Sequence, residues 1–225
     1  MIKRLLFAFI LVVGCSSLLS AQNKGKDIPF RMSIRACATV PHSMSNKAFR
    51  RSFTGIYDIT ASFNYQVFHG VNVGIQYRTN EWKTPDNKIP GLNTYAQGHH
   101  GGLRVEYDMP TGPTSVAYVG LMAEEGMVKY FGLSFSPGTD LTDLKKKYYF
   151  HTVELETGIF FYTEGSFAIG VHGDCVFTNY KFDPYSIHLD QHKAYIPSDL
   201  HGTWSHLDIG FVLVYSFFRK IPASN

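Results

Sequence analysis

GIYDITASFNYQVFHGVNVGIQYRT, residues 55–79, alternates between apolar and polar side chains along nearly all of its length. Such alternation is typical of a β-strand with one apolar and one polar face. His69-Gly70 interrupts the pattern and leaves room only for a hairpin turn. Each arm of the predicted antiparallel hairpin has about ten residues, which is the length that a tilted strand needs to cross a bilayer. The segment therefore predicts a membrane β-barrel.

The same alternation recurs along the rest of the chain and predicts six more strands. Their approximate ranges are 30–40, 99–108, 114–127, 152–161, 167–174 and 207–217. In the segment 114–127 both sets of alternate residues are apolar, so the pattern leaves the facing of this strand open. With the hairpin, the chain is expected to form eight strands.

The connections between the predicted strands alternate in length. Short turns are expected at His69-Gly70, at 110–113 and at Glu164-Gly165, and longer loops at 41–53, 83–97, 129–147 and 178–202. Outer-membrane barrels with an even number of strands have brief periplasmic turns and longer outer loops in this order. We therefore predict an all-β protein, an eight-stranded antiparallel up-and-down transmembrane β-barrel with short periplasmic turns and long outer loops.

The N-terminus has the order of a cleaved secretory signal peptide. Lys3 and Arg4 precede an apolar run, and small residues follow up to Ala21. We expect residues 1–21 to be removed and residues 22–225 to form the barrel domain. Cleavage before Cys15, as in a lipoprotein, is the alternative. Export of a membrane barrel predicts a location in the outer membrane of a Gram-negative bacterium.

The composition is that of a folded, aromatic-rich chain, with 44% hydrophobic and 15% aromatic residues, and aromatic residues favour sheet. The net charge is +3, and no basic run is longer than 145–147. This balance gives no reason to expect a nucleic-acid partner. Export permits a disulfide, but Cys37 and Cys175 fall on opposite faces of the predicted strands, so we expect no bond between them.

Alternation alone does not decide whether the apolar face meets lipid or the core of a secreted, soluble lipocalin-like barrel. The lysines all lie in predicted loops or termini, as expected if the polar face lines a narrow lumen. That face carries ions of both signs, which must be paired when they are confined. We predict a lumen charge network of Arg35, Asp58, Arg78, Arg104, Glu106, Glu154, Glu156, Asp174 and Asp208.

Aromatic residues gather where the predicted strands end, as in the two interfacial girdles of a membrane barrel. The predicted interfacial aromatics are Tyr65, Trp82, Tyr107, Phe161, Phe167, Trp204, Tyr215 and Phe217. The two tryptophans would lie at the outer end and the other six near the short turns. Strand length and these girdles favour the membrane barrel over the soluble one.

This architecture resembles the eight-stranded outer-membrane β-barrel proteins, the group of the OmpA transmembrane domain, OmpX and OmpW. The resemblance extends over about residues 28–218 and lies in the strand pattern, not in a sequence motif. It implies the fold and carries no site residues with it. The chain departs from the group by continuing past Phe218 as RKIPASN.

Eight strands enclose an interior that side chains fill, so we interpret the lumen charges as a plug. We expect a non-enzymatic integral outer-membrane protein whose outer loops bind a partner or serve envelope or secretion machinery. The expected partners are outer-membrane lipid and a protein at the outer loops. A small channel is an alternative.

A lipid-modifying enzyme, similar to lipid A deacylases and acyltransferases, is the rival class. Ser205, His206 and Asp208 lie together near the predicted outer rim, but a catalytic relay requires the three groups to converge. Alternation points Ser205 to lipid and the other two inward, so no catalytic residue is expected.

A metal-binding loop is a further alternative. His188 and His192 are four residues apart and would offer two ligands if their loop were helical. Loop histidines are more commonly solvated, so neither a metal site nor a cofactor is expected.

Overall fold

The computed structural model describes residues 32–90, 92–134, 142–163, 165–191 and 193–217. The expected signal peptide at 1–21, the start of the first predicted strand, the turn residue Glu164, His192 and the RKIPASN tail lie outside these residues.

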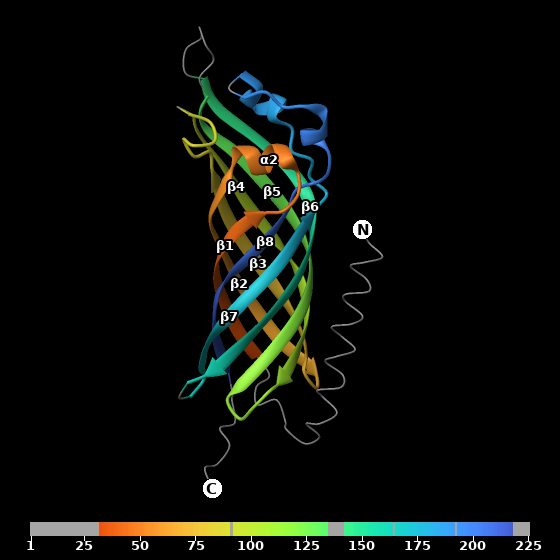
Figure 1. Ribbon diagram of the computed structural model, residues 1–225. Coiled ribbons are helices and arrows are strands. Elements are labelled where there is room, and N and C mark those ends of the chain that lie inside the picture. The colour runs from red at the N-terminus through yellow and green to blue at the C-terminus, as the bar shows by residue number, and fades with distance from the viewer. Residues whose placement is uncertain (1–31, 91, 135–141, 164, 192, 218–225) are drawn as a thin grey trace.

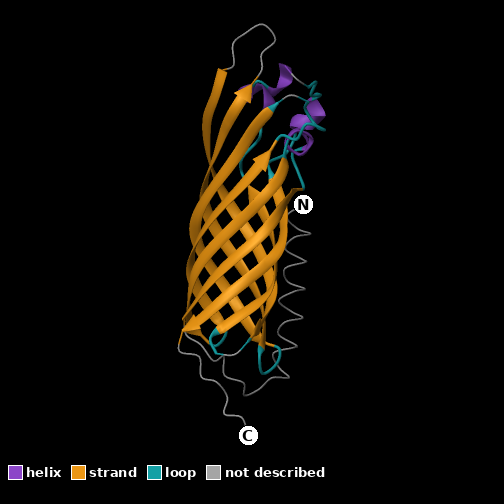
Figure 2. Cartoon of the chain, turned by 90° about the vertical axis from the view of Figure 1, so that its left-hand side faces the viewer, coloured by secondary structure: helices purple, strands orange, loops and turns teal. Residues whose placement is uncertain are grey.

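Eight strands form a closed barrel in which every neighbouring pair is antiparallel (Figures 1 and 2). Each strand pairs with its neighbours in the sequence, and the first strand also pairs with the last. The strands are β1 (Met32–Ser43), β2 (Thr54–Phe68), β3 (Val71–Lys83), β4 (Asn93–Pro110), β5 (Ser115–Ser134), β6 (Thr142–Tyr162), β7 (Phe167–Thr178) and β8 (Ser205–Phe217). The predicted fold class is confirmed.

The quoted segment forms β2 and β3, and His69-Gly70 forms the turn between them as expected. Gly70 has a φ of 75°, a left-handed conformation that glycine adopts without strain. Antiparallel pairing then places Phe63 opposite Ile75 and Ala61 opposite Tyr77. The apolar residues of both arms therefore share one face of the sheet.

Several strands extend further than the sequence predicted, most of all β4, β5 and β6. β4 begins at Asn93, β5 ends at Ser134 and β6 begins at Thr142, so 93–97, 129–134 and 142–147 are strand where loops were expected. The extra residues remain paired, for example Lys129 with Lys147. These ends rise above the rest of the barrel at the end that carries the long connections (Figures 1 and 2). The apolar alternation stops there because the outward face of these strand ends lies beyond the lipid. Backbone pairing between the strands continues.

The outside of the barrel carries a broad apolar belt. Ile75, Leu103 and Phe211 expose 61, 69 and 66% of their surface. Other large apolar side chains exposed on the same face are Ile34, Val40, Ile59, Phe63, Val73, Val105, Leu121, Val153, Ile169, Val171, Ile209 and Leu213. Water-soluble monomers rarely expose contiguous apolar patches of this extent. The belt is therefore a surface for lipid acyl chains.

The facing of β5, which the sequence left open, is now defined. Val116, Tyr118 and Met122 are buried, whereas Leu121 is exposed. The even-numbered side chains of this strand thus point into the barrel, and the odd-numbered ones point outward.

The expectation that every lysine lies in a loop or terminus is wrong. Lys83, Lys129 and the residues 145–147 lie on β3, β5 and β6. They occupy the outer parts of these strands, on or beyond the last apolar positions of the belt. Lysine is tolerated there because the outer strand ends reach water, while the strand segments inside the belt remain free of it among the described residues.

The connections at the outer end are folded. Helix α2 (Lys47–Ser52) follows β1, and three short 3₁₀ helices, η1 (Pro184–Ile187), η2 (Leu189–Gln191) and η3 (Pro197–Leu200), lie between β7 and β8. They cover one side of the outer mouth (Figure 1). Within the described ranges, no helix has the length and apolar character needed to cross a lipid bilayer.

A charge placed on the belt should destabilise the barrel. Ile75→Arg puts a guanidinium among Phe63 and Leu103, its cross-strand neighbours, and we expect a loss of about 2–4 kcal/mol in unfolding free energy in a bilayer. The measurement is urea unfolding of the protein folded in lipid vesicles.

Tyr149→Arg is the matched control for this prediction. Tyr149 exposes 78% of its surface on β6 beyond the belt, so the change should stay within about 0.5 kcal/mol. Equal effects of the two substitutions would contradict a lipid-facing belt.

Candidate functional site

The interior of the barrel is occupied by side chains at three successive levels. An apolar cluster lies towards the short turns, a charge network fills the middle, and an aromatic cap lies at the outer mouth. The lower cluster consists of Cys37, Val116, Tyr118, Phe160, Tyr162, Ala168, Val212 and Val214. Cys37 points inward in this cluster, whereas Cys175 belongs to the outward-facing series of β7, as the alternation predicted.

Arg35 and Arg104 form the lower half of the charge network. Nη2 of Arg35 donates to both carboxylate oxygens of Asp108 at 3.0 and 3.2 Å, and Nη1 pairs with Glu106. Its guanidinium also lies 4.6 Å from the ring centroid of Tyr118, a cation–π contact. Arg104 shares Glu106 with Arg35 and pairs in addition with Glu156. Two arginines are thus linked through one carboxylate.

Gly120 makes room for this network. A Cβ at this position would lie 2.4 Å from Oε1 of Glu156 and 2.8 Å from its Cγ. The absence of a side chain on β5 therefore lets Glu156 on β6 pass over this strand to Arg104 on β4.

Arg78 is the centre of the upper half of the network. Its Nη2 donates to Asp174 at 2.7 Å and to Glu154 at 3.1 Å, and its Nε lies 3.3 Å from Asp58. Asp208 lies 3.7 Å from Nη1. One guanidinium is therefore shared by four carboxylates from β2, β6, β7 and β8, all of them buried.

All nine residues of the expected lumen network are buried in the interior, and each takes part in one of these ion pairs. The sequence prediction missed other members, namely Asp108, Glu124, Gln76, Asn72, His100, His172 and His206. Asp108 follows Glu106 on the same face, so alternation could have identified it. Glu124 could not be assigned while the facing of β5 was open.

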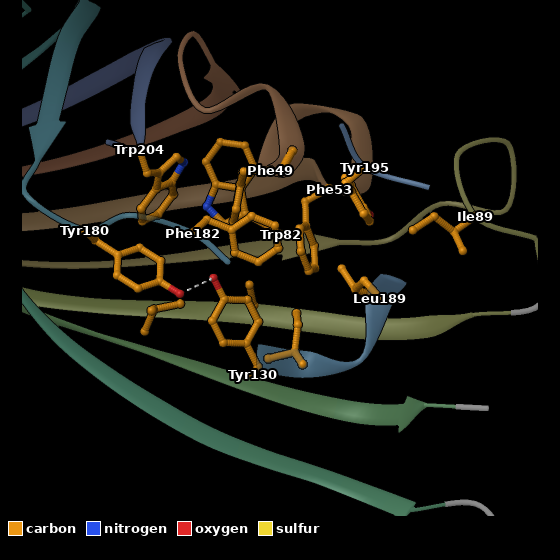
Figure 3. Packing of buried hydrophobic residues seen from close by; sticks show 14 of the residues in the cluster. Phe49, Phe53, Trp82, Ile89, Tyr130, Tyr180, Phe182, Leu189, Tyr195 and Trp204 are labelled. Atoms are coloured by element: carbon orange, nitrogen blue, oxygen red, sulfur yellow. Dashed lines mark hydrogen bonds between the residues drawn. The ribbon is translucent and has the colours of Figure 1, made fainter. Parts of the chain in front are cut away.

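The aromatic cap is a cluster of buried side chains at the outer mouth (Figure 3). The ring of Phe49 lies 5.2 Å from that of Trp82 and 4.9 Å from that of Trp204, and Phe182 packs against Phe49 at 5.2 Å. Ile89 and Leu189 join the same buried cluster. The cap thus combines residues of α2, β3, the β3–β4 connection and the β7–β8 connection.

Trp82 and Trp204 were expected in an outer interfacial girdle, and this prediction is wrong. Both are almost completely buried, with 1 and 0% of their surface exposed. Trp82 has an even number on β3 and therefore points inward, and Trp204 precedes β8 inside the cap. The loops supply enough apolar surface to bury both indoles, which the strand pattern did not reveal.

The six other expected girdle residues lie near the short turns. Tyr65, Phe161, Phe167 and Tyr215 are exposed, and Tyr107 and Phe217 are partly exposed. Phe167 and Phe217 each pack against Tyr215 with ring centroids 4.9 Å apart. This end of the belt therefore carries an aromatic row at the level where a bilayer meets water.

Polar contacts hold the cap on the barrel. Asn46 accepts a hydrogen bond from the backbone N–H of Phe49 at 3.0 Å and so caps α2. Asp199 in η3 pairs with Lys47, 3.0 Å away, and with Arg51. The Lys47 ammonium, the backbone N–H of Ile196 and the Arg51 guanidinium hold the pKa of Asp199 below its usual range. Asp199 therefore links the β7–β8 connection to α2.

The proposed relay of Ser205, His206 and Asp208 does not form. The Ser205 hydroxyl lies 2.7 Å from that of Ser45 and is buried, so the expectation that it points to lipid is wrong. Neither ring nitrogen of His206 has a hydrogen-bond partner among the described residues. His188 has a left-handed φ of 61° at the end of η1, and His192 lies outside the described ranges.

A closed barrel with a lipid-facing belt and a filled, charged interior defines a transmembrane β-barrel of the outer-membrane type. No family model matches the sequence, and no curated protein matches it. Solved structures resemble it in fold. The crystal structure of Neisserial surface protein A matches with a TM-score of 0.51 at 10% identity, over 83% of this chain and 97% of that chain.

Two further solved structures have lower TM-scores. Ail, the attachment invasion locus protein of Yersinia pestis, in complex with the heparin analogue sucrose octasulfate, has a TM-score of 0.46 at 9% identity over 84% of this chain and 100% of that chain. The outer membrane protease OmpT from Escherichia coli has a TM-score of 0.40 at 9% identity over 87 and 99%. The match to Neisserial surface protein A confirms the expected resemblance to outer-membrane barrels at the level of the fold.

Removing the shared guanidinium should unfold much of the barrel. Arg78→Met leaves four buried carboxylates without their common cation, and we expect a loss of about 3–5 kcal/mol in unfolding free energy, or failure to fold. Urea unfolding in lipid vesicles measures the effect. Arg50→Met, at an exposed position in α2, is the control and should change the free energy by less than about 0.5 kcal/mol.

The cap should loosen in acid. Because the folded pKa of Asp199 is lowered, its contribution is present above the ordinary aspartate pKa of about 3.9 and is lost as pH falls below that value through the folded pKa. Tryptophan fluorescence reports the cap, since both tryptophans lie in it. Asp199→Asn should lower the thermal midpoint of this signal near neutral pH and reduce its fall in acid. An identical pH profile in the two proteins would contradict this role.

Proposed function

We propose that this protein is a non-enzymatic integral outer-membrane β-barrel with a closed lumen, which acts through the surface of its outer cap. The observation that supports this proposal is the filling of the barrel interior at all three levels. An open conduit needs a continuous water-filled path, and the network centred on Arg35, Arg104 and Arg78 crosses that path. The apolar belt would contact outer-membrane lipid.

The folded cap supports a binding function. Loops on a rigid scaffold are frequent binding sites, and here packing on Trp82 and Trp204 gives the loops a defined shape. Lys193 and Lys88 add anchors, since their ammonium groups donate to the backbone oxygens of Arg51 and Phe53 at 3.1 and 2.6 Å. Such an ordered surface loses little conformational entropy when it binds.

The cap presents apolar groups to the outside. Tyr185 in η1 and Ile196 before η3 expose 46 and 55% of their surface. They lie beyond the lipid-facing belt, so lipid does not account for their exposure. This surface suits a protein partner, either a ligand of the cell surface or a component of envelope or secretion machinery.

Conductance measurements separate the closed barrel from a small channel. The purified protein in planar lipid bilayers should show no single-channel steps above the baseline. Regular steps of one size in the wild-type protein would contradict the closed lumen.

Photo-crosslinking in cells tests the binding surface. A photoreactive amino acid at position 185 or 196 should give a discrete adduct with another macromolecule, whereas the same amino acid at Ile59 on the belt should give none with protein. Absence of adducts at both cap positions would count against the proposal.

A separate assay tests the enzymatic alternative. Release of fatty acid from lipid A by the purified protein would favour a lipid-modifying enzyme.

A further inference from the structure

Three potential ligands converge in the lumen beneath the aromatic cap. They are Asp58 on β2 and His206 and Asp208 on β8, each completely buried. One ligand atom from each lies within 4.8 Å of the others. A buried group of two carboxylates and one imidazole is the type of donor set that binds a divalent metal ion.

His206 and Asp208 have polar atoms that the described residues leave without hydrogen bonds. This applies to both ring nitrogens of His206 and to both carboxylate oxygens of Asp208. The indoles of Trp82 and Trp204 pack against the imidazole with ring centroids 5.5 and 5.0 Å away. Buried polar atoms nearly always have a partner, so these atoms point to a ligand.

The distances within the group suit coordination better than hydrogen bonding. Nε2 of His206 lies 3.4 Å from Oδ2 of Asp208 and 3.9 Å from Oδ2 of Asp58. Hydrogen bonds between nitrogen and oxygen are usually about 2.7–3.2 Å long. Two ligand atoms that are each about 2.0–2.2 Å from a tetrahedral zinc ion lie about 3.3–3.6 Å apart. Small shifts would therefore bring all three atoms into the coordination sphere of one ion.

The charge at this level also favours a cation. Arg78 is shared by four carboxylates, and Asp208 is the most distant of them at 3.7 Å. One guanidinium cannot pair closely with four carboxylates, so a further cation beside Asp208 would find its charge compensated in a buried place, where ions must be paired. Asn80 donates to Oδ2 of Asp58 at 3.2 Å and so orients this carboxylate, as residues behind metal ligands commonly do.

A second group of three possible ligands, Glu154, His172 and Asp174, fits an ion less well. His172 bonds to Asp174 through Nε2 at 2.8 Å and to Tyr118 through Nδ1 at 2.7 Å. Asp174 is also paired with Arg78 at 2.7 Å. Both nitrogens of this histidine are engaged in hydrogen bonds, so neither is free to bind a metal ion.

We propose that Asp58, His206 and Asp208 bind one divalent transition-metal ion, with zinc as the representative of the class. An imidazole ligand favours such ions over calcium or magnesium, which prefer oxygen ligands alone. Because β1 pairs with both β2 and β8, the ion connects the two strands that flank β1. It therefore reinforces the seam at which the barrel closes.

Metal content after folding tests this proposal. The full chain is unfolded in urea with a chelator and folded into detergent with zinc, then dialysed and analysed by mass spectrometry for metal. Wild-type protein should retain one zinc ion per chain, and zinc added during folding should raise its thermal midpoint. Cobalt in place of zinc should give the visible absorption of a site with a nitrogen ligand.

Two variants and one control locate the site. Asp208→Asn and His206→Gln should bind zinc at least tenfold more weakly and should lose the thermal shift. His172→Gln removes two buried hydrogen bonds and should lower the thermal midpoint, but it should keep the wild-type zinc affinity and the rise of that midpoint with zinc. Heat-modifiable gel migration shows which proteins are folded. Wild-type barrel that retains no zinc, or zinc binding that is lost only in His172→Gln, would overturn the proposal.

Discussion

The buried charges inside the barrel must pair with one another. Hydrocarbon surrounds the belt, and side chains fill the lumen, so Arg78 and the carboxylates around it must satisfy one another. The closed sheet meets the same demand for the backbone, since every strand has two neighbours. The four acids come from β2, β6, β7 and β8, and the arginine comes from β3. The network thus joins strands from opposite sides of the barrel.

The aromatic cap shields the buried charges at the outer mouth. A charged lumen that ended in open loops would admit water to the network from above. Phe49, Trp82 and Trp204 instead form an apolar layer directly over it, and Asp199 ties the β7–β8 connection to α2. The same packing therefore covers the charge network and orders the surface that we propose for binding.

The strand pattern predicted the parts of the fold in which each residue has lipid on one side and the lumen on the other. Ile59 and Asp58 follow this rule, and so do Ile75 and Arg78. The rule gave no facing for β5, because Val116 and Tyr118 belong to the apolar cluster inside the barrel. Where the inward residues of a strand are also small or apolar, alternation cannot distinguish them from the outward residues of the belt.

Beyond the belt, the sequence was a poorer guide. Lys129 and Lys147 are paired on strands, although their neighbourhood has the composition of a loop. Trp82 and Trp204 were assigned to a girdle by their place at strand ends, whereas folded loops bury them. His206 lies close to Asp58 because of the way in which the strands close the barrel. The two residues are far apart in the sequence, so local spacing could not predict this contact.

The apolar face of the sheet meets lipid, and the charged face is enclosed. Spin labels at positions 59 and 211, where Ile59 and Phe211 face outward, test this arrangement most directly in protein folded into vesicles, with a label at Tyr185 in the cap for comparison. We expect oxygen dissolved in lipid to relax the labels at 59 and 211, and a water-soluble nickel complex to relax only the label at 185. Strong relaxation of the labels at 59 and 211 by the nickel complex would contradict this arrangement.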